Sequence, residues 1–275
     1  MMIDEQSVNY FHTSDVTLAY VEGPPNGLPL LLIHGTGSRW QPFRSILPAL
    51  VEKYHVYAID LRGHGQSSHM PGAYHLASYA RDVHQFITDH VQRPVIIYGH
   101  SLGALVAIKL ADSEPQSVSA LILGDPPLYS WNTPTEETFW KEAFTDLLNF
   151  MLAYPDPEKM NNWLVQNMPN MSSERREERA ESLRTLDPDV IRAVITDDLT
   201  KGISLEQLVR NVACPVLLLK GNQKLGSALR EQDVEFATTR FSNIHVLEME
   251  TIGHGIIPPS QLPQMIEFIN REIKR

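Results

Sequence analysis

The sequence predicts an α/β fold: a doubly wound, mostly parallel sheet with a helical cap inserted between two of its strands. Three observations predict it. Short apolar runs alternate with amphipathic stretches of helix length along most of the 275 residues. Residues 131–210 contain several helical patterns and no strand pattern. A glycine-flanked serine stands where one apolar run meets a helical pattern.

Six apolar runs have the length and composition of buried strands. They are residues 30–33, 56–59, 95–98, 120–123, 216–219 and 244–247. Between and after them we expect helices over residues 43–53, 78–90, 102–114, 233–240 and 263–275. This alternation predicts βαβ units, whose parallel strands are covered by helices on both faces.

Residues 131–210 break the alternation. Helical patterns there cover 135–153, 157–168, 173–186 and 187–200, and prolines stand at helix-start or turn positions. We therefore expect a core of residues 1–130 and 211–275 and a helical cap over 131–210. The mixed charges of residues 173–184 fit a solvent-exposed helix face.

The composition excludes several classes of function. A formal net charge of −10 disfavours binding to nucleic acid, because a polyanion is repelled on average. The first 15 residues lack the basic and apolar regions of a secretory signal, and we expect a soluble, cytoplasmic protein with no membrane partner. The single cysteine, Cys214, cannot form an internal disulfide and is expected to be a buried small side chain.

The strongest motif is Gly99-His-Ser-Leu-Gly103, which follows a strand pattern and precedes a helical one. In that context G-x-S-x-G is typical of a strained turn that lifts the serine oxygen out of the sheet. Glycines flank the serine because a Cβ there would collide with neighbouring backbone. We therefore expect Ser101 to be a nucleophile, whereas the alternative is a surface turn that happens to contain serine.

Two further segments complete a candidate site. His34-Gly-Thr-Gly37 follows the strand at 30–33, and backbone N–H groups of such a glycine-rich loop can approach an oxyanion closely. We expect the N–H groups of Thr36 and Leu102 to form an oxyanion hole, and His34 to hold the loop. His254, between two glycines after the last strand, has the best context for the general base that serine needs.

Four motifs in this order resemble the α/β-hydrolase family with a helical cap. They are the HGTG segment, Asp60-Leu-Arg-Gly-His-Gly-Gln-Ser67, the GHSLG segment and the glycine-histidine pair near the end. The resemblance covers nearly the whole chain and implies that the cap follows strand 6. It also implies that Arg62 and His64 are structural.

One element of the family pattern is absent. Family members usually carry the triad acid a few residues after the strand at 216–219, where this sequence reads Gly221-Asn-Gln-Lys224. Some haloalkane dehalogenases carry it after the preceding strand, and here that strand leads into Asp125. Asp125 is therefore our candidate, although aspartate before proline also starts turns. Glu231 and Asp233 are weaker candidates.

These residues predict a serine hydrolase that cleaves a carboxylic ester or related acyl compound through an acyl-enzyme on Ser101. A C–C bond hydrolase or a lactonase with the same triad, and a non-catalytic ligand-binding relative, remain alternatives. The partner is a small-molecule acyl substrate, and no metal or other cofactor is implied. Cap residues that could line an acyl pocket, or pack the cap core instead, are Trp131, Phe139, Trp140, Phe144, Phe150, Met151 and Trp163.

Overall fold

An eight-stranded sheet forms the centre of the computed structural model, which describes residues 7–128, 139–153, 156–169 and 171–273. Its spatial order is β1-β2-β4-β3-β5-β6-β7-β8. The pairs β1–β2 and β2–β4 are antiparallel, and the other neighbours are parallel. The strands are β1 (Asn9–His12), β2 (Thr17–Glu22), β3 (Leu28–Ile33), β4 (Tyr54–Ile59), β5 (Val95–His100), β6 (Val118–Gly124), β7 (Val216–Gly221) and β8 (Ile244–Met249).

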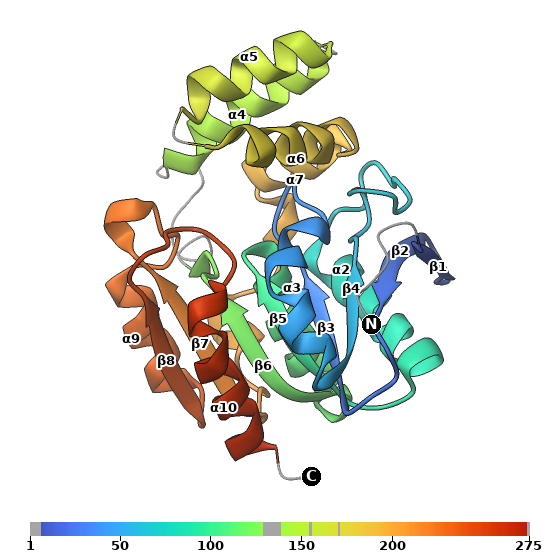
Figure 1. The fold of residues 1–275 in the computed structure, drawn as a ribbon, viewed down its shortest axis with the longest axis vertical. Helices are drawn as coiled ribbons and strands as arrows, with labels where there is room; N and C mark the ends of the chain where they lie inside the picture. The colour runs from blue at the N-terminus through green and yellow to red at the C-terminus, as the bar shows by residue number, and fades with distance from the viewer. Residues whose placement is uncertain (1–6, 129–138, 154–155, 170, 274–275) are drawn as a thin grey trace.

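Helices cover both faces of the sheet (Figure 1). Alternate residues of β3 show the two layers, because Leu31 and Ile33 join one core cluster while Leu30 and Leu32 join the other. The first cluster includes α2 (Leu76–Gln85), α3 (Leu102–Ser113) and α9 (Glu231–Arg240); the second includes α1 (Leu47–Val51) and α10 (Leu262–Glu272). The predicted doubly wound, mostly parallel fold is confirmed.

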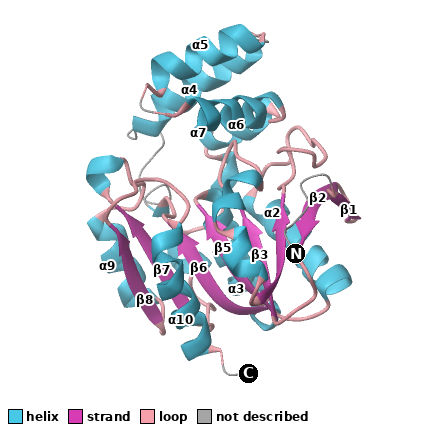
Figure 2. Cartoon of the chain, viewed as in Figure 1, coloured by secondary structure: helices cyan, strands magenta, loops and turns pink. Residues whose placement is uncertain are grey.

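Between β6 and β7 the described chain is helical, as the sequence predicts. The elements are α4 (Phe139–Leu152), α5 (Pro157–Asn167), α6 (Ser173–Arg184), α7 (Pro188–Ile195) and α8 (Leu205–Leu208). In Figures 1 and 2, α4, α5, α6 and α7 lie together above the sheet. Part of the helix expected over 135–153, and Trp131, lie outside the described residues. Whether this insertion is a separate cap domain stays a prediction.

Two features differ from the sequence-based expectation. The antiparallel strands β1 and β2 are not among the expected strands. β1 is mostly exposed and gives no buried-strand pattern. β2 contains a buried apolar run at residues 18–21, as long as the runs of the expected strands, but it was not predicted. The helix expected over 43–53 is instead a 3₁₀ turn at Gln41–Ser45 followed by the short α1, each with a proline in its first turn. No helix among the described residues is long and apolar enough to span a membrane.

Candidate active site

Ser101 occupies the tight turn between β5 and α3. Its backbone has φ 53° and ψ −117°, a conformation that costs energy for a residue with a side chain. The neighbouring glycines permit it: a Cβ on Gly103 would lie 2.2 Å from the carbonyl oxygen of Ile33, and one on Gly99 would lie 2.3 Å from that of Gly103. The turn therefore has the strained geometry that the motif predicts.

His254 reaches this serine from the loop after β8. Its Nε2 lies 3.0 Å from Ser101 Oγ, so the serine hydroxyl can donate to the imidazole. Its Nδ1 lies 2.6 Å from Oδ2 of Asp125, to which it donates. Three residues that are far apart in the chain therefore form one line of hydrogen bonds, in the order that a nucleophile, a base and an orienting acid require.

Asp125 follows β6 directly and is fully buried, with φ 46°. Besides the imidazole, its carboxylate accepts hydrogen bonds from Ser227 Oγ at 2.5 Å, from the N–H of Ala228 at 2.8 Å and from the N–H of Leu229 at 3.2 Å. Burial alone would raise the pKa of Asp125, but these hydrogen bonds outweigh burial and the pKa lies below its ordinary value. The carboxylate is therefore held ionised beside His254.

The glycine-rich loop after β3 lies against the serine. A Cβ on Gly35 would be 2.8 Å from Ser101 Cβ, so only glycine fits this approach. Among the described residues, neither the N–H of Thr36 nor that of Leu102 donates to a protein acceptor. Leu102 is the first residue of α3, where N–H groups have no partner within the helix. Both donors are thus free to meet a ligand.

Two buried histidines hold that loop. His34 accepts a hydrogen bond from the N–H of Leu61 at its Nε2 and donates from Nδ1 to the Gly35 carbonyl. His64 accepts from the N–H of Gly37 and donates to the Arg62 carbonyl. Burial lowers the pKa of His34 to about 4 and that of His64 well below its ordinary value, so both are neutral. Neither ring forms a hydrogen bond with Ser101 in the described structure, which agrees with a structural role.

Comparison with known proteins then gives the family. The sequence profile of the alpha/beta hydrolase fold matches residues 29–223, most of the chain. The chain belongs to the alpha/beta hydrolase fold family.

Several relatives are similar over long stretches. A serine hydrolase-like protein of Danio rerio is 30% identical over 200 residues, which cover 70% of this chain and 54% of that protein. The 2-(acetamidomethylene)succinate hydrolase of Mesorhizobium japonicum is 28% identical over 213 residues, 74% of each chain. This chain thus spans about half the length of the Danio rerio relative, and only 29% of an uncharacterized Mycobacterium tuberculosis relative.

Solved structures share the fold. A variant of N-formylmaleamic acid deformylase from Pseudomonas putida superposes with a TM-score of 0.78 at 22% identity, covering 96% of this chain and 100% of that one. The structure of E-2-(acetamidomethylene)succinate hydrolase gives a TM-score of 0.74 at 21% identity and covers 96% and 97% of the two chains.

At the usual acid position of alpha/beta hydrolases, this chain has residues that do not reach His254. Asn222 is bound to the backbone, with Nδ2 donating to the Glu250 carbonyl at 2.8 Å. The weaker candidates are also engaged elsewhere: Glu231 pairs with Lys220 at 2.6 Å, and Asp233 pairs with Arg230 at 3.1 Å. Among the described residues, Asp125 is the carboxylate in contact with the histidine.

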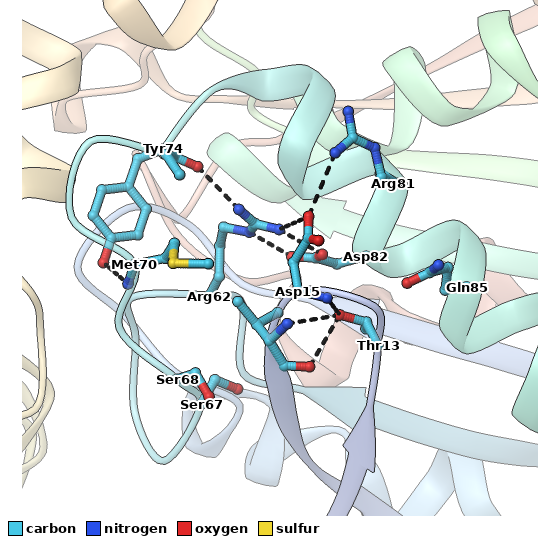
Figure 3. A network of polar contacts seen from close by, with 12 residues as sticks. Thr13, Asp15, Arg62, Ser67, Ser68, Met70, Tyr74, Arg81, Asp82 and Gln85 are labelled. Atoms are coloured by element: carbon cyan, nitrogen blue, oxygen red, sulfur yellow. Dashed lines mark hydrogen bonds and ion pairs between the residues drawn. The ribbon is translucent and has the colours of Figure 1, made fainter.

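The buried Arg62 belongs to a network of polar contacts (Figure 3). Its Nε and Nη2 donate to the two carboxylate oxygens of Asp82 at 2.6 and 2.7 Å, and Nη1 donates to the Ala73 carbonyl at 3.2 Å. Nearby, Tyr74 donates from its hydroxyl to Asp187, just before α7. The network ties the loop after β4 to α2, while Tyr74 links it to the helical insertion.

Of the aromatic residues expected to line a pocket, Trp140 lies beside the catalytic histidine candidate. The ring of Trp140 is 5.9 Å from that of His254, and the ring of Phe144 is 6.1 Å from Trp140. Phe150 stacks on Trp163 at 5.0 Å, and Met151 is buried, so these three pack the insertion itself. Trp131 and the side chain of Phe139 lie outside the described part of the structure.

Two contributors have no signal in the sequence. Ser227 supports Asp125 across 102 positions of sequence, from a segment with no motif. Arg179 of α6 donates from Nη1 to the Gly37 carbonyl at 2.6 Å, although its segment reads as a solvent-exposed helix face. Among the described residues, no group of three or more His, Cys, Asp or Glu side chains is arranged to hold a metal ion.

Proposed function

We propose that this protein is a serine hydrolase that cleaves a carboxylic ester or a related acyl compound through an acyl-enzyme on Ser101. The observation that carries the proposal is the continuous line from Ser101 Oγ through His254 to Asp125, with contacts of 3.0 and 2.6 Å. The names of similar proteins, a serine hydrolase-like protein and a succinate-derivative hydrolase, support hydrolysis.

The residues give the first half of the reaction. Ser101 Oγ attacks the acyl carbon while His254 Nε2 takes the hydroxyl proton, and the ionised Asp125 stabilises the imidazolium that forms. The N–H groups of Thr36 and Leu102 donate to the oxygen that becomes negative, and a single such donor is worth roughly 3 kcal/mol. His254 then returns the proton to the leaving group, and the acyl-enzyme remains.

The second half repeats these steps with water. His254 Nε2 removes a proton from a water molecule, whose oxygen attacks the acyl carbon. The same two N–H groups hold the second oxyanion. Ser101 Oγ leaves as the acid is released and regains its proton from His254. This chemistry acts on a small-molecule substrate and needs no cofactor and no nucleic-acid or membrane partner. A cytoplasmic location stays a prediction.

C–C bond hydrolysis and lactone hydrolysis remain alternatives, because the same three side chains serve them and the substrate decides between them. A ligand-binding protein without turnover is a different class of function. The free N–H groups of Thr36 and Leu102, placed beside an activated serine, argue against binding alone, since a receptor has no need of them.

The test is hydrolysis of 4-nitrophenyl acetate and butyrate at pH 7 to 8 by the wild type, Ser101→Ala and the control Ser113→Ala, whose serine is exposed at the end of α3. We expect turnover in the wild type and the control, and a loss of about 10⁴-fold or more in Ser101→Ala. A fluorophosphonate probe should label the wild type at Ser101. Equal rates in all three proteins, without labelling, would refute the proposal.

A further inference from the structure

Arg179 brings a positive charge to the loop that carries Thr36. It lies half-buried on α6, one turn before the buried Leu183, and therefore on the face of the helix turned toward the core. Its Nη1 donates to the Gly37 carbonyl at 2.6 Å. Gly37 has φ 66°, and a Cβ there would lie 3.3 Å from this Nη1 and 3.4 Å from Leu186. The guanidinium thus covers the glycine directly.

The charge of Arg179 has no counterion among the described residues. No carboxylate lies within 4.0 Å of it, although α6 carries several glutamates. Two of them are directed elsewhere: Glu178 pairs with Arg44 at 3.6 Å, and Glu181 pairs with Arg39 at 3.8 Å and with Arg184 at 2.7 Å. A partly desolvated charge without a partner is costly, and an anion bound beside it would offset that cost.

The guanidinium remains charged and has donors to spare. Burial lowers the pKa of Arg179 to about 10, which still leaves the side chain protonated at neutral pH. Only Nη1 is used by Gly37, and the edge formed by Nε and Nη2 has no protein partner in the described part of the chain. Two parallel N–H groups on one edge match the two oxygens of a carboxylate.

The position relative to the nucleophile sets the size of the ligand. Gly35 packs against Ser101, and Gly37 lies only two residues further, a span of at most about 7 Å along the chain. Thr36, whose N–H is the proposed oxyanion donor, stands between them. A small acyl group on Ser101 could therefore place its carbonyl oxygen at Thr36 and a terminal anion near Arg179.

We propose that Arg179 is a specificity-determining residue that binds a carboxylate on the acyl part of the substrate, so that the preferred substrates are small monoesters or monoamides of dicarboxylic acids. The inference rests on the proposed hydrolase function. It names the substrate class of the same site, and it assigns to the helical insertion the selection of charged over neutral acyl groups.

A matched pair of esters tests the inference. Mono-4-nitrophenyl succinate and 4-nitrophenyl butyrate have acyl chains of equal length, but only the first ends in a carboxylate. In Arg179→Gln we expect the ratio of their kcat/KM values, succinate over butyrate, to fall about tenfold or more, mainly through KM for the succinate. Arg179→Lys should give an intermediate ratio, because an ammonium keeps the charge but cannot form the bidentate hydrogen bonds of a guanidinium with a carboxylate.

Arg175→Gln is the matched control, because this arginine is exposed on the same helix. Its ratio should equal that of the wild type. An equal fall of both substrates in Arg179→Gln would overturn the inference, since it would mean that Arg179 only holds the Gly37 carbonyl. An unchanged ratio would overturn it as well.

A binding measurement separates this inference from the proposed function. Succinate titrated calorimetrically into Ser101→Ala should bind about tenfold or more tightly than into the double variant Ser101→Ala/Arg179→Gln. Should the wild type hydrolyse neither ester, the hydrolase proposal fails while this titration still tests the carboxylate site. Equal succinate affinity in the two proteins, or no binding to either, would refute the role of Arg179.

Discussion

The hydroxyl of Ser227 donates to Oδ1 of Asp125 at 2.5 Å, while Oδ2 of the same carboxylate accepts from His254 at 2.6 Å. One side chain after β7 therefore fixes the orientation of a carboxylate after β6. Members of the family usually carry the triad acid in the segment after β7. In this protein that segment instead supplies groups that hold Asp125: the Ser227 hydroxyl and the N–H groups of Ala228 and Leu229.

Replacing Ser227 with alanine should weaken both stability and turnover. The lost hydrogen bond to a charged group should lower the free energy of unfolding at pH 7 by roughly 1.5 to 3 kcal/mol, measured by urea denaturation, with Ser113→Ala as control. Hydrogen bonds that lower the pKa of Asp125 stabilise the fold above the carboxylate's unfolded pKa, and this stability is lost as the pH falls. The two proteins should therefore converge in stability below about pH 4. A constant difference at every pH would contradict this account.

Asp125→Asn should reduce kcat by about 10⁴-fold with little change in KM, because an amide cannot stabilise the imidazolium. The control is Glu231→Gln, which removes an exposed carboxylate that pairs with Lys220. Its kcat should stay at the wild-type value. A fall of less than about tenfold in Asp125→Asn, with a large fall in Glu231→Gln, would place the acid elsewhere.

Much of this site could be predicted from sequence because its parts are local. A glycine-flanked turn at Ser101, a glycine-rich loop at Thr36 and a histidine between glycines each carry their signal within a few residues, and the parallel sheet brings them to one edge. Asp125 is predicted only through the resemblance to those family members that carry the acid after the preceding strand. Ser227 and Arg179 could not be found, because their roles arise from contacts across 102 and 142 positions, and no local pattern encodes those contacts.

The neutral histidine His34 should make the protein less stable in mild acid. Burial lowers its pKa to about 4, whereas the unfolded chain takes up a proton near pH 6.5. Stability should therefore fall as the pH drops from about 6.5 toward 4, by roughly 2 kcal/mol at pH 5 for this residue alone. Asp60, whose pKa burial raises to about 6, opposes part of this fall by binding a proton in the folded state.

His34→Gln isolates the contribution of His34 to the loss of stability in acid, because glutamine keeps an acceptor for the N–H of Leu61 but does not titrate. Urea denaturation at pH 7 and pH 5 should give a smaller difference in unfolding free energy for this variant than for the wild type. Equal differences in the two proteins would show that His34 does not contribute to the acid sensitivity.

Two arginines of one network should differ sharply in their contribution to stability (Figure 3). Arg62 and Asp82 are each 2% exposed, so Arg62→Met leaves a buried carboxylate unpaired and should cost about 3 to 5 kcal/mol of unfolding free energy. Arg81, 58% exposed, pairs with the 37% exposed Asp15 at 3.4 Å, and Arg81→Met should cost less than about 1 kcal/mol. Similar losses in urea denaturation would refute the assignment of Arg62 to the buried core of the network.

Gly35→Ala should impair the oxyanion loop through a single methyl group. The added Cβ would lie 2.8 Å from Ser101 Cβ and 3.2 Å from Nδ1 of His100. Neither neighbour can move freely, because His100 is the last residue of β5 and Ser101 forms the turn that follows it. The loop must therefore shift away and carry the Thr36 N–H with it, so kcat should fall roughly 10² to 10³-fold.

The control is Gly202→Ala, where φ is 76° but no atom of another part of the chain lies within 4 Å of the added Cβ. Its stability should fall slightly and its kcat should not change. Because no positive φ is involved at Gly35, a loss of kcat there reports the collision with the serine turn, and unaltered kcat would mean that Thr36 is not the donor.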